Sequence, residues 1–319
     1  MSNPSITTFF QWAINLAGGG LPATQLIDSV SGRLGILQET VDSTGQNAEL
    51  TGRVNRMRVV GTPIEPTFMM EPTAKEWTFL WPWLLGGTTT GAGPWVYEPG
   101  NDLPLRGIQG AEERGGTTKL HNYTNLAVDS WTLRSSPGKL IGLDIATVAN
   151  GGAYEETTAF PALTNFDNVT SPFSFPDLTG EGATGQDGTF TIGDTPYDPF
   201  SISLECRYNL DRARRPHSLM AKGLRKRTRD LTLPLNLPAA DAEAIYAADL
   251  RGLTGLPVVM AWRNPVESVE FLKIDLASVI FPRPDHDLPA RDEVRPNVTG
   301  IIKFDGTNPP IRVVVQLRT

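Results

Sequence analysis

The chain has 319 residues, a formal net charge of −7 and a single cysteine, Cys206. The surplus of acid argues against a general nucleic-acid-binding surface, and one cysteine excludes an intramolecular disulfide and fits an intracellular site of assembly. The 31 glycines and 26 prolines, in a chain of which only 20% is charged, favour many short strands joined by turns. No apolar run approaches the roughly 18 residues of a membrane span, so we expect no membrane segment.

The first segment, residues 4–37, is a polar and aromatic lead-in. Its aromatic and apolar residues Phe9, Phe10, Trp12 and Ile14 fit either a helical turn or a short strand. The segment is therefore either an ordinary N-terminal element or an arm that docks on a neighbouring molecule. Loose alternation of apolar residues over residues 34–60 then predicts strands.

The stretch 61–87 predicts a strand followed by a short amphipathic helix. The strand covers residues 62–70, and its prolines favour a sheet edge or a bulge over a central position. Thr73 and Glu76 have the spacing of a capping box, Pro82 is expected to kink or shorten the last turn, and two glycines end the helix. The expected core residues, spaced i, i+3, i+4 and i+7 on one helix face, are Trp77, Leu80, Trp81 and Leu84.

The same plan recurs over residues 225–252. Leucines alternate with other residues over 231–237, which is typical of a half-buried strand. Pro238 then opens a predicted helix over 239–251, and Gly252 closes it. The helix residues expected to face the core are Ile245, Tyr246 and Leu250.

Strand-like runs follow both predicted helices. Two copies of a sheet with a short helix account for this order better than one large fold. We therefore predict a mainly β protein (β+α) made of two tandem β-sandwich or split-barrel modules, each with a flanking short α-helix, in residues 1–150 and 151–319. The strand-like runs are residues 127–133 and 140–149 after the first helix, and 257–262, 269–280, 299–304 and 311–317 after the second.

Two long stretches read as irregular loops, residues 88–125 and 151–199, and such loops are usually functional or ordered by a partner. The second begins a charge asymmetry. Residues 151–206 contain nine acidic residues and no Lys or Arg, whereas residues 207–229 contain nine basic residues and one acid, Asp211. An acidic segment is thus followed directly by a basic one.

The charge asymmetry favours self-association, in which the basic segment of one subunit meets acidic loops of the next. Pairing of the two segments within one chain, or a solvated basic face worth little energy, are the alternatives. A nucleic-acid site would need interleaved aromatic residues, and only Tyr208 is present. The candidate inter-subunit contacts are Arg212, Arg214, Arg215, Lys222, Arg225, Lys226, Arg227 and Arg229.

The sequence contains no recognisable catalytic motif. The patterns G-x-S-x-G, G-x-x-x-x-G-K-[ST] and G-x-G-x-x-G are all absent. Of the three histidines, His286 lies between Asp285 and Asp287, but this cluster lacks a distant fourth ligand. We therefore expect no enzyme activity, no metal and no cofactor, and interpret the chain as a structural protein.

Five runs carry a resemblance to a known family: RMRVVGTPIEPTFMMEPTAKEWTFLWPWLLGG, DSWTLRSSPGKLIGLDIATVA, FPAL, SPFSFPDL and FSISLECRYNLDRARR. In this order they resemble the major tail tube proteins of long-tailed, siphovirus-like bacteriophages, in the class with two tube modules per chain. The resemblance covers residues 32–319. It implies a virion protein whose modules join their inner strands into a barrel around a lumen, in trimeric rings of pseudo-sixfold symmetry that stack through loops or hairpins.

The resemblance also implies partners and a location. The partners would be further copies of the chain and other tail proteins, such as the tape measure, tail tip and terminator, while viral DNA would pass through the lumen without specific binding. An acidic lumen would repel DNA phosphates. The protein would assemble in the cytoplasm of the host bacterium and reside in the virion tail.

Two other functions stay open on the sequence. One is a β-sandwich binding module for a carbohydrate or host surface, with Trp81, Trp83, Trp95 and Trp262 exposed for stacking on sugars. The other is a tail terminator or adaptor, which would form a single ring and not stack.

Overall fold

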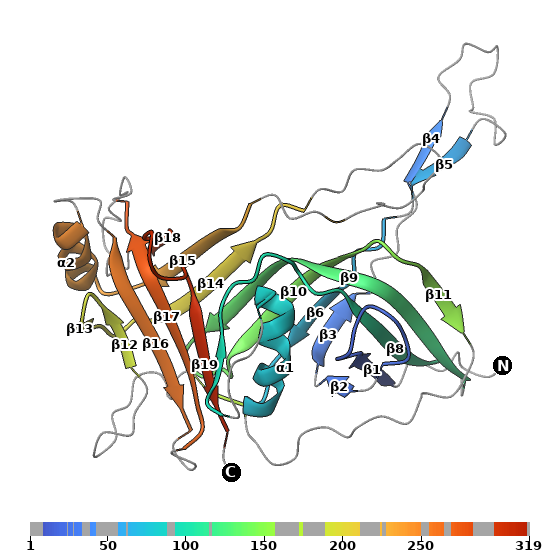
Figure 1. Ribbon diagram of the computed structural model, residues 1–319, viewed down its shortest axis with the longest axis horizontal. Helices are drawn as coiled ribbons and strands as arrows, with labels where there is room; N and C mark the ends of the chain where they lie inside the picture. Colours follow the sequence, from blue (N-terminus) through green and yellow to red (C-terminus); the bar gives the residue numbers. More distant parts are fainter. Residues whose placement is uncertain are drawn as a thin grey trace, which may run out of the picture.

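The computed structural model describes residues 9–23, 25–27, 29–33, 39–42, 57–61, 63–87, 93–114, 117–156, 172–174, 189–210, 224, 228–249, 255–264, 269–282 and 297–317. In these residues the protein is mainly β, with two short helices and one large antiparallel sheet (Figure 1). We call the part from β1 to β11 the first half and the part from β12 to β19 the second half.

The first half contains α1 (Ala74–Leu85) and the strands β1 (Phe9–Ile14), β2 (Gln25–Ile27), β3 (Ser29–Arg33), β4 (Glu39–Asp42), β5 (Met57–Gly61), β6 (Thr67–Met70), β7 (Trp95–Tyr97), β8 (Arg106–Arg114), β9 (Thr117–Ser135), β10 (Gly142–Ala149) and β11 (Ala153–Glu156). The second half contains α2 (Ala239–Asp249) and the strands β12 (Thr189–Ile192), β13 (Thr195–Pro196), β14 (Ser201–Arg207), β15 (Asp230–Asn236), β16 (Leu256–Arg263), β17 (Phe271–Ile280), β18 (Asn297–Ile302) and β19 (Arg312–Gln316).

The long strand β9 organises the first half. Its beginning pairs with β8 on one edge and with β11 on the other. Its end pairs with β10, and the ladder continues through β6 to β3. From β8, a second ladder continues through β1 to β2. Strand β9 therefore takes part in both ladders of the first half.

The second half repeats a ladder of similar order. Strand β14 pairs with β15, β15 with β18, and β18 with the end of β17. The other edge of β17 pairs with β16, which leads to β12 and β13. The start of β17 also pairs with β19.

Two ladders join the halves into one sheet. The end of β9 pairs with β14 over six residue pairs, from Ser135↔Ile202 to Ser130↔Arg207. On the other side of the molecule, β19 pairs with β7. Strands β4 and β5 pair only with each other, and Figure 1 shows this hairpin projecting away from the main sheet.

Helix α1 covers the apolar face of the first half. Thr73 and Glu76 form the predicted capping box, in which each side chain accepts a hydrogen bond from the backbone of the other residue. All four predicted core residues of this helix are fully buried. Trp81 stacks on Trp77 and makes an edge contact with Trp131 of β9, with ring centroids 5.6 Å apart. This aromatic contact packs the helix onto the sheet.

Pro82 does not end or shorten α1, because a second residue replaces the lost hydrogen bond. Proline has no N–H to donate to the carbonyl four residues earlier, which here belongs to Thr78. The hydroxyl of Tyr97 in β7 donates to that carbonyl oxygen at 2.7 Å. The helix consequently continues to Leu85 and ends at Gly86, whose positive φ of 74° closes it.

Helix α2 covers Ala239–Asp249 of the predicted 239–251, and residues 250–254 are outside the described part of the chain. Its first turn begins after Pro238, whose carbonyl accepts from the N–H of Ala242. Ile245 and Tyr246 are buried, while Leu250 lies outside the described residues.

Three expectations about where loops and strands lie in the chain were wrong. Residues 88–125 are not one irregular loop, because β7, β8 and the start of β9 lie in them. Strand β8 does not show alternating apolar residues, because some of its buried side chains are polar and bond to polar side chains of β9. For example, Nε2 of Gln109 donates to Oδ1 of Asn122 at 2.6 Å. Residues 151–199 likewise contain β11, β12 and β13. The strand predicted at 62–70 is confined to β6, and both of its edges are paired.

The N-terminal segment is an ordinary strand and not a free arm over its described part. Strand β1 lies between β2 and β8. Trp12 is fully buried, and its ring makes an edge contact with Phe68 at 4.6 Å between centroids.

The hydrogen bond between Tyr97 and Thr78 predicts a specific pattern of stability. Tyr97→Phe is expected to lower the free energy of unfolding by about 1 kcal/mol, the usual contribution of such a bond. In a Pro82→Ala background the restored N–H of residue 82 serves the same carbonyl, so Tyr97→Phe should cost less. Urea denaturation of the four proteins of this double-mutant cycle measures the coupling. Equal costs in both backgrounds would contradict this assignment.

Candidate functional site

The described residues contain no group of three His, Cys, Asp or Glu side chains placed to hold a metal ion. The Asp285–Asp287 cluster lies outside the described residues. Within the described part of the chain, neither helix is long and apolar enough to cross a membrane. The features that remain are surfaces and open strand edges.

One face of the sheet carries exposed or half-buried side chains across both halves, most of them polar, and we call it the polar face. A single row of paired residues crosses eight strands, and the side chains next to it along each strand point to the opposite face. That opposite face carries buried residues such as Ile145, Leu133 and Leu204. The row consists of Ser31, Met69, Asp144, Thr132, Glu205, Thr232, Ile301 and Ile280.

The charges on this polar face balance. Along the described parts of β3, β6, β10, β9, β14 and β15, it carries three carboxylates and three guanidinium groups. Arg134 and Asp144 form an ion pair at 2.7 Å across β9 and β10. In the described residues the face therefore has no strong net charge. The charged residues are Asp144, Glu205, Asp230, Arg33, Arg134 and Arg207.

The polar face ends at an open edge. Among the described strands, β3 pairs only with β6. A shallow groove of about 350 Å³ begins there and runs over β6 and β10 to β9, lined by Ser31, Arg33, Met69 and Asp144 among others. Unpaired edges present backbone N–H and C=O groups that can pair with a further strand. The edge of β3 is thus available for an added strand.

The end of α1 is held by residues from the second half. The carbonyl oxygen of Leu84 accepts a hydrogen bond from the hydroxyl of Tyr208. One nitrogen of Arg229 donates to the carbonyl oxygens of Leu85 and Gly100, at 3.1 and 3.0 Å. A cation at this position also complements the negative end of the helix dipole. We call these contacts the helix clamp.

The helix clamp fixes both ends of the basic segment 211–227. Tyr208 precedes the segment and Arg229 follows it, and the Arg229 guanidinium lies 5.3 Å from the centre of the Tyr208 ring. Burial raises the pKa of the Tyr208 hydroxyl above its ordinary value, so this group stays a hydrogen-bond donor at neutral pH. The described residues on either side of the basic segment are thus in contact with each other and with the end of α1.

Of the eight predicted inter-subunit residues, the structure describes Arg229 alone, and it uses that residue within the chain. The other seven lie outside the described residues: Arg212, Arg214, Arg215, Lys222, Arg225, Lys226 and Arg227. Sequence reasoning missed Tyr208 as a partner of this segment, although an aromatic residue beside an arginine-rich run is a signal for a cation–π contact.

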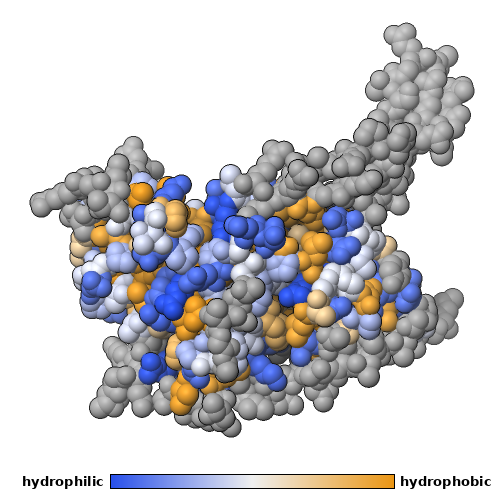
Figure 2. Space-filling view, in the orientation of Figure 1, coloured by the Kyte–Doolittle hydropathy of each residue, from blue (hydrophilic) through white to orange (hydrophobic). Residues whose placement is uncertain are grey.

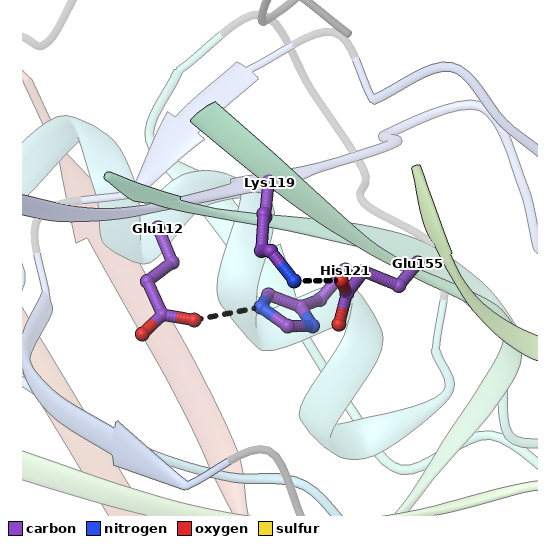
Figure 3. Close-up of polar contacts among 4 residues, drawn as sticks. All are labelled: Glu112, Lys119, His121 and Glu155. Carbon is purple, nitrogen blue, oxygen red and sulfur yellow. Dashed lines mark hydrogen bonds and ion pairs between the residues drawn. The ribbon is translucent and has the colours of Figure 1, made fainter. Parts of the chain in front are cut away.

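A second polar cluster lies where β8, β9 and β11 meet (Figure 3). Glu112 and His121 are 7% and 6% exposed, and their Oε2 and Nε2 atoms are 3.1 Å apart. Beside them, Lys119 and Glu155 form an ion pair at 2.5 Å. The first contact ties β8 to β9, and the second ties β9 to β11.

The tryptophans expected to stack on sugars are not available for that purpose. Trp81, Trp83 and Trp262 are fully buried, and Trp95 of β7 is half-buried. In the view of Figure 2, hydrophilic and hydrophobic residues are interspersed over the described surface. Of these four tryptophans, Trp95 alone has a partly exposed side chain.

Comparison with models of known protein families and with curated proteins finds no match for this chain.

The helix clamp predicts a strong effect of Arg229. Arg229→Met keeps most of the side-chain volume but removes both hydrogen bonds, and is expected to lower the free energy of unfolding by about 2 kcal/mol. The matched control is Arg207→Met, which removes an exposed guanidinium from the polar face and should change stability by less than about 0.5 kcal/mol. Thermal and urea unfolding measure both. Equal effects of the two substitutions would show that the clamp contributes nothing.

Proposed function

We propose that this chain is the tail tube protein of a long-tailed bacteriophage, a structural tile that assembles into stacked rings around a hollow lumen. The observation that carries the proposal is the ladder between β9 and β14. This ladder joins a strand of the first half to a strand of the second half, so that the polar face continues from one half to the other. A tube built by strand joining needs such a joint between every pair of neighbouring modules.

The equivalence of the two halves supports two tandem modules. In chain order, the first half has β3, β6, α1, β9 and β10, and the second half has β14, β15, α2, β17 and β18. In space the order is β3–β6–β10–β9 and β14–β15–β18–β17. Because β11 pairs with β9, we assign residues up to Glu156 to the first module.

Ring closure follows from repeating the internal joint. Within the chain, β9 of the first module meets β14 of the second. The strand equivalent to β14 is β3, whose outer edge is open among the described strands, and the strand equivalent to β9 is β17. On the corresponding edge of β17, residues 271–279 are paired with β16, so this strand can meet β3 of the next chain only from Ile280 onward. A head-to-tail contact of this kind closes by rotation. Three chains with two modules each then give a ring of pseudo-sixfold symmetry.

In this arrangement the polar face of the sheet lines the lumen, because the opposite face is packed with apolar side chains and α1. Its described charges balance, and Arg134 is held by Asp144 at 2.7 Å. Such a lining has no excess of cations to bind DNA phosphates. The proposed lumen lining is therefore polar, with its described positive and negative charges in balance. The net charge of the chain alone had suggested an acidic lining.

Stacking of rings is assigned to two segments that occupy equivalent positions in the chain order. The β4–β5 hairpin lies between β3 and β6, and the basic segment 211–227 lies between β14 and β15. An isolated two-stranded hairpin is marginally stable in water, so β4–β5 gains most from docking on another copy. The basic segment starts from the helix clamp and offers charges that acidic loops of a neighbouring ring can meet.

The test of this proposal is sedimentation of the wild-type protein beside two charge-reversed triple variants. Arg225→Glu, Lys226→Glu and Arg227→Glu together should abolish large assemblies while leaving a folded monomer or single ring. Lys75→Glu, Lys139→Glu and Lys303→Glu reverse the same number of exposed charges elsewhere and should assemble like the wild type.

The other outcomes are also informative. Wild type that stays monomeric at all concentrations contradicts the tube function. Single rings that never stack, in the wild type as well, would instead identify a terminator or adaptor. Equal assembly of both triple variants would remove the basic segment from the stacking contact.

A further inference from the structure

We infer that apolar side chains at the two ends of the polar face meet across the joint between neighbouring chains, where Ile280 and Ile301 of one chain contact Met69 of the next. The inference rests on the proposed function, because these two ends meet only if the chains close into a ring. The partner of this surface is therefore a second copy of the chain.

The large apolar side chains of the polar face lie at its two ends. On the four middle strands, β10, β9, β14 and β15, the described side chains of this face are polar or charged, or belong to the small residues glycine, alanine and proline. At one end, Met69 of β6 is 41% exposed. At the other end, Ile301 of β18 and Ile280 of β17 lie opposite each other and are half-buried. Single exposed apolar residues are common on protein surfaces, but these three flank the two edges that ring closure brings together.

The joint within the chain predicts the register of the joint between chains. In the row of paired residues across the polar face, Ser31 is the first member and Ile280 the last. The row passes from the first half to the second at the pair Thr132↔Glu205. Ser31 and Glu205 lie on equivalent strands, as do Ile280 and Thr132. A repeat of the internal joint therefore places Ile280 opposite Ser31 of the next chain.

This register agrees with the ladder between β16 and β17. That ladder ends at the pair Leu256↔Val279, so Ile280 is the first residue of β17 that can face another strand on this edge. Ser31 is exposed, and it lines the shallow groove of about 350 Å³ together with Met69. The end of β17 thus arrives beside a hollow that can receive an isoleucine side chain.

The small side chain of Ser31 lets the apolar residues on either side of it approach each other. Neighbouring strands are about 4.8 Å apart, so Ile280 and Met69 of the next chain are two strand spacings apart with Ser31 between them. The unbranched, flexible side chain of methionine can reach across a serine. Burial of these side chains excludes water from the joint, and apolar contacts between strands stabilise a sheet.

A disulfide between chains tests the register. Opposite residues of antiparallel strands have Cα atoms about 4.5–5.5 Å apart, which a disulfide can span. Ser31→Cys combined with Ile280→Cys, assembled and then oxidised with diamide, should give covalent dimers and trimers on non-reducing gels. The matched control combines Ser31→Cys with Thr299→Cys, because Thr299 is exposed on β18 but lies away from the joint. The control should run as a monomer, since the native Cys206 is buried.

A serine substitution tests the apolar contact itself. Met69→Ser should keep the melting temperature of the wild type, because the side chain is exposed in the single chain, and should need about fivefold more protein to assemble. Val269→Ser removes an apolar side chain that is 54% exposed between β16 and β17, and should assemble like the wild type.

The outcomes separate this inference from the proposed function. Wild-type tubes, together with no cross-linked species from the variant with cysteines at positions 31 and 280, would leave the tube function standing and overturn the inference. Equal effects of Met69→Ser and Val269→Ser on assembly would overturn it as well. A wild type that never assembles contradicts both.

Discussion

The whole structure depends on the length of one strand. Strand β9 spans residues 117–135 and pairs with three strands besides its joint to the second half. Its beginning pairs with β8 and β11, and its end pairs with β10 and β14. A strand of ordinary length, about 5–6 residues, could pair with only one of these two sets of strands. The continuity of the polar face across both halves follows from this strand.

The helix clamp complements this strand joint. The end of α1 receives hydrogen bonds from Tyr208 and Arg229, which lie where β14 ends and β15 begins. The first half thus supplies a helix terminus, and the second half supplies its cap. Because the missing N–H of Pro82 is replaced by the hydroxyl of Tyr97, that terminus keeps its helical form.

The sequence predicted the local elements better than their connections. The capping box of Thr73 and the apolar stripe of α1 are local signals, and the structure contains both. Strand β8 was missed because Gln109 and Glu112 are buried in polar pairs with residues of β9, a contact that no periodicity reveals. The open edge that β3 has among the described strands depends on pairings between distant residues, which the sequence does not encode as a pattern. The basic segment, by contrast, was visible from composition alone.

The measurement that tests the central claim most directly is negative-stain electron microscopy of the purified protein, with the mass of the smallest ring determined by light scattering. The account predicts hollow tubes, end-on images with sixfold rotational symmetry, and a smallest ring with the mass of three chains. Rings with the mass of six chains would contradict the assignment of two tube modules to one chain. Compact particles without a central hole would contradict the tube itself.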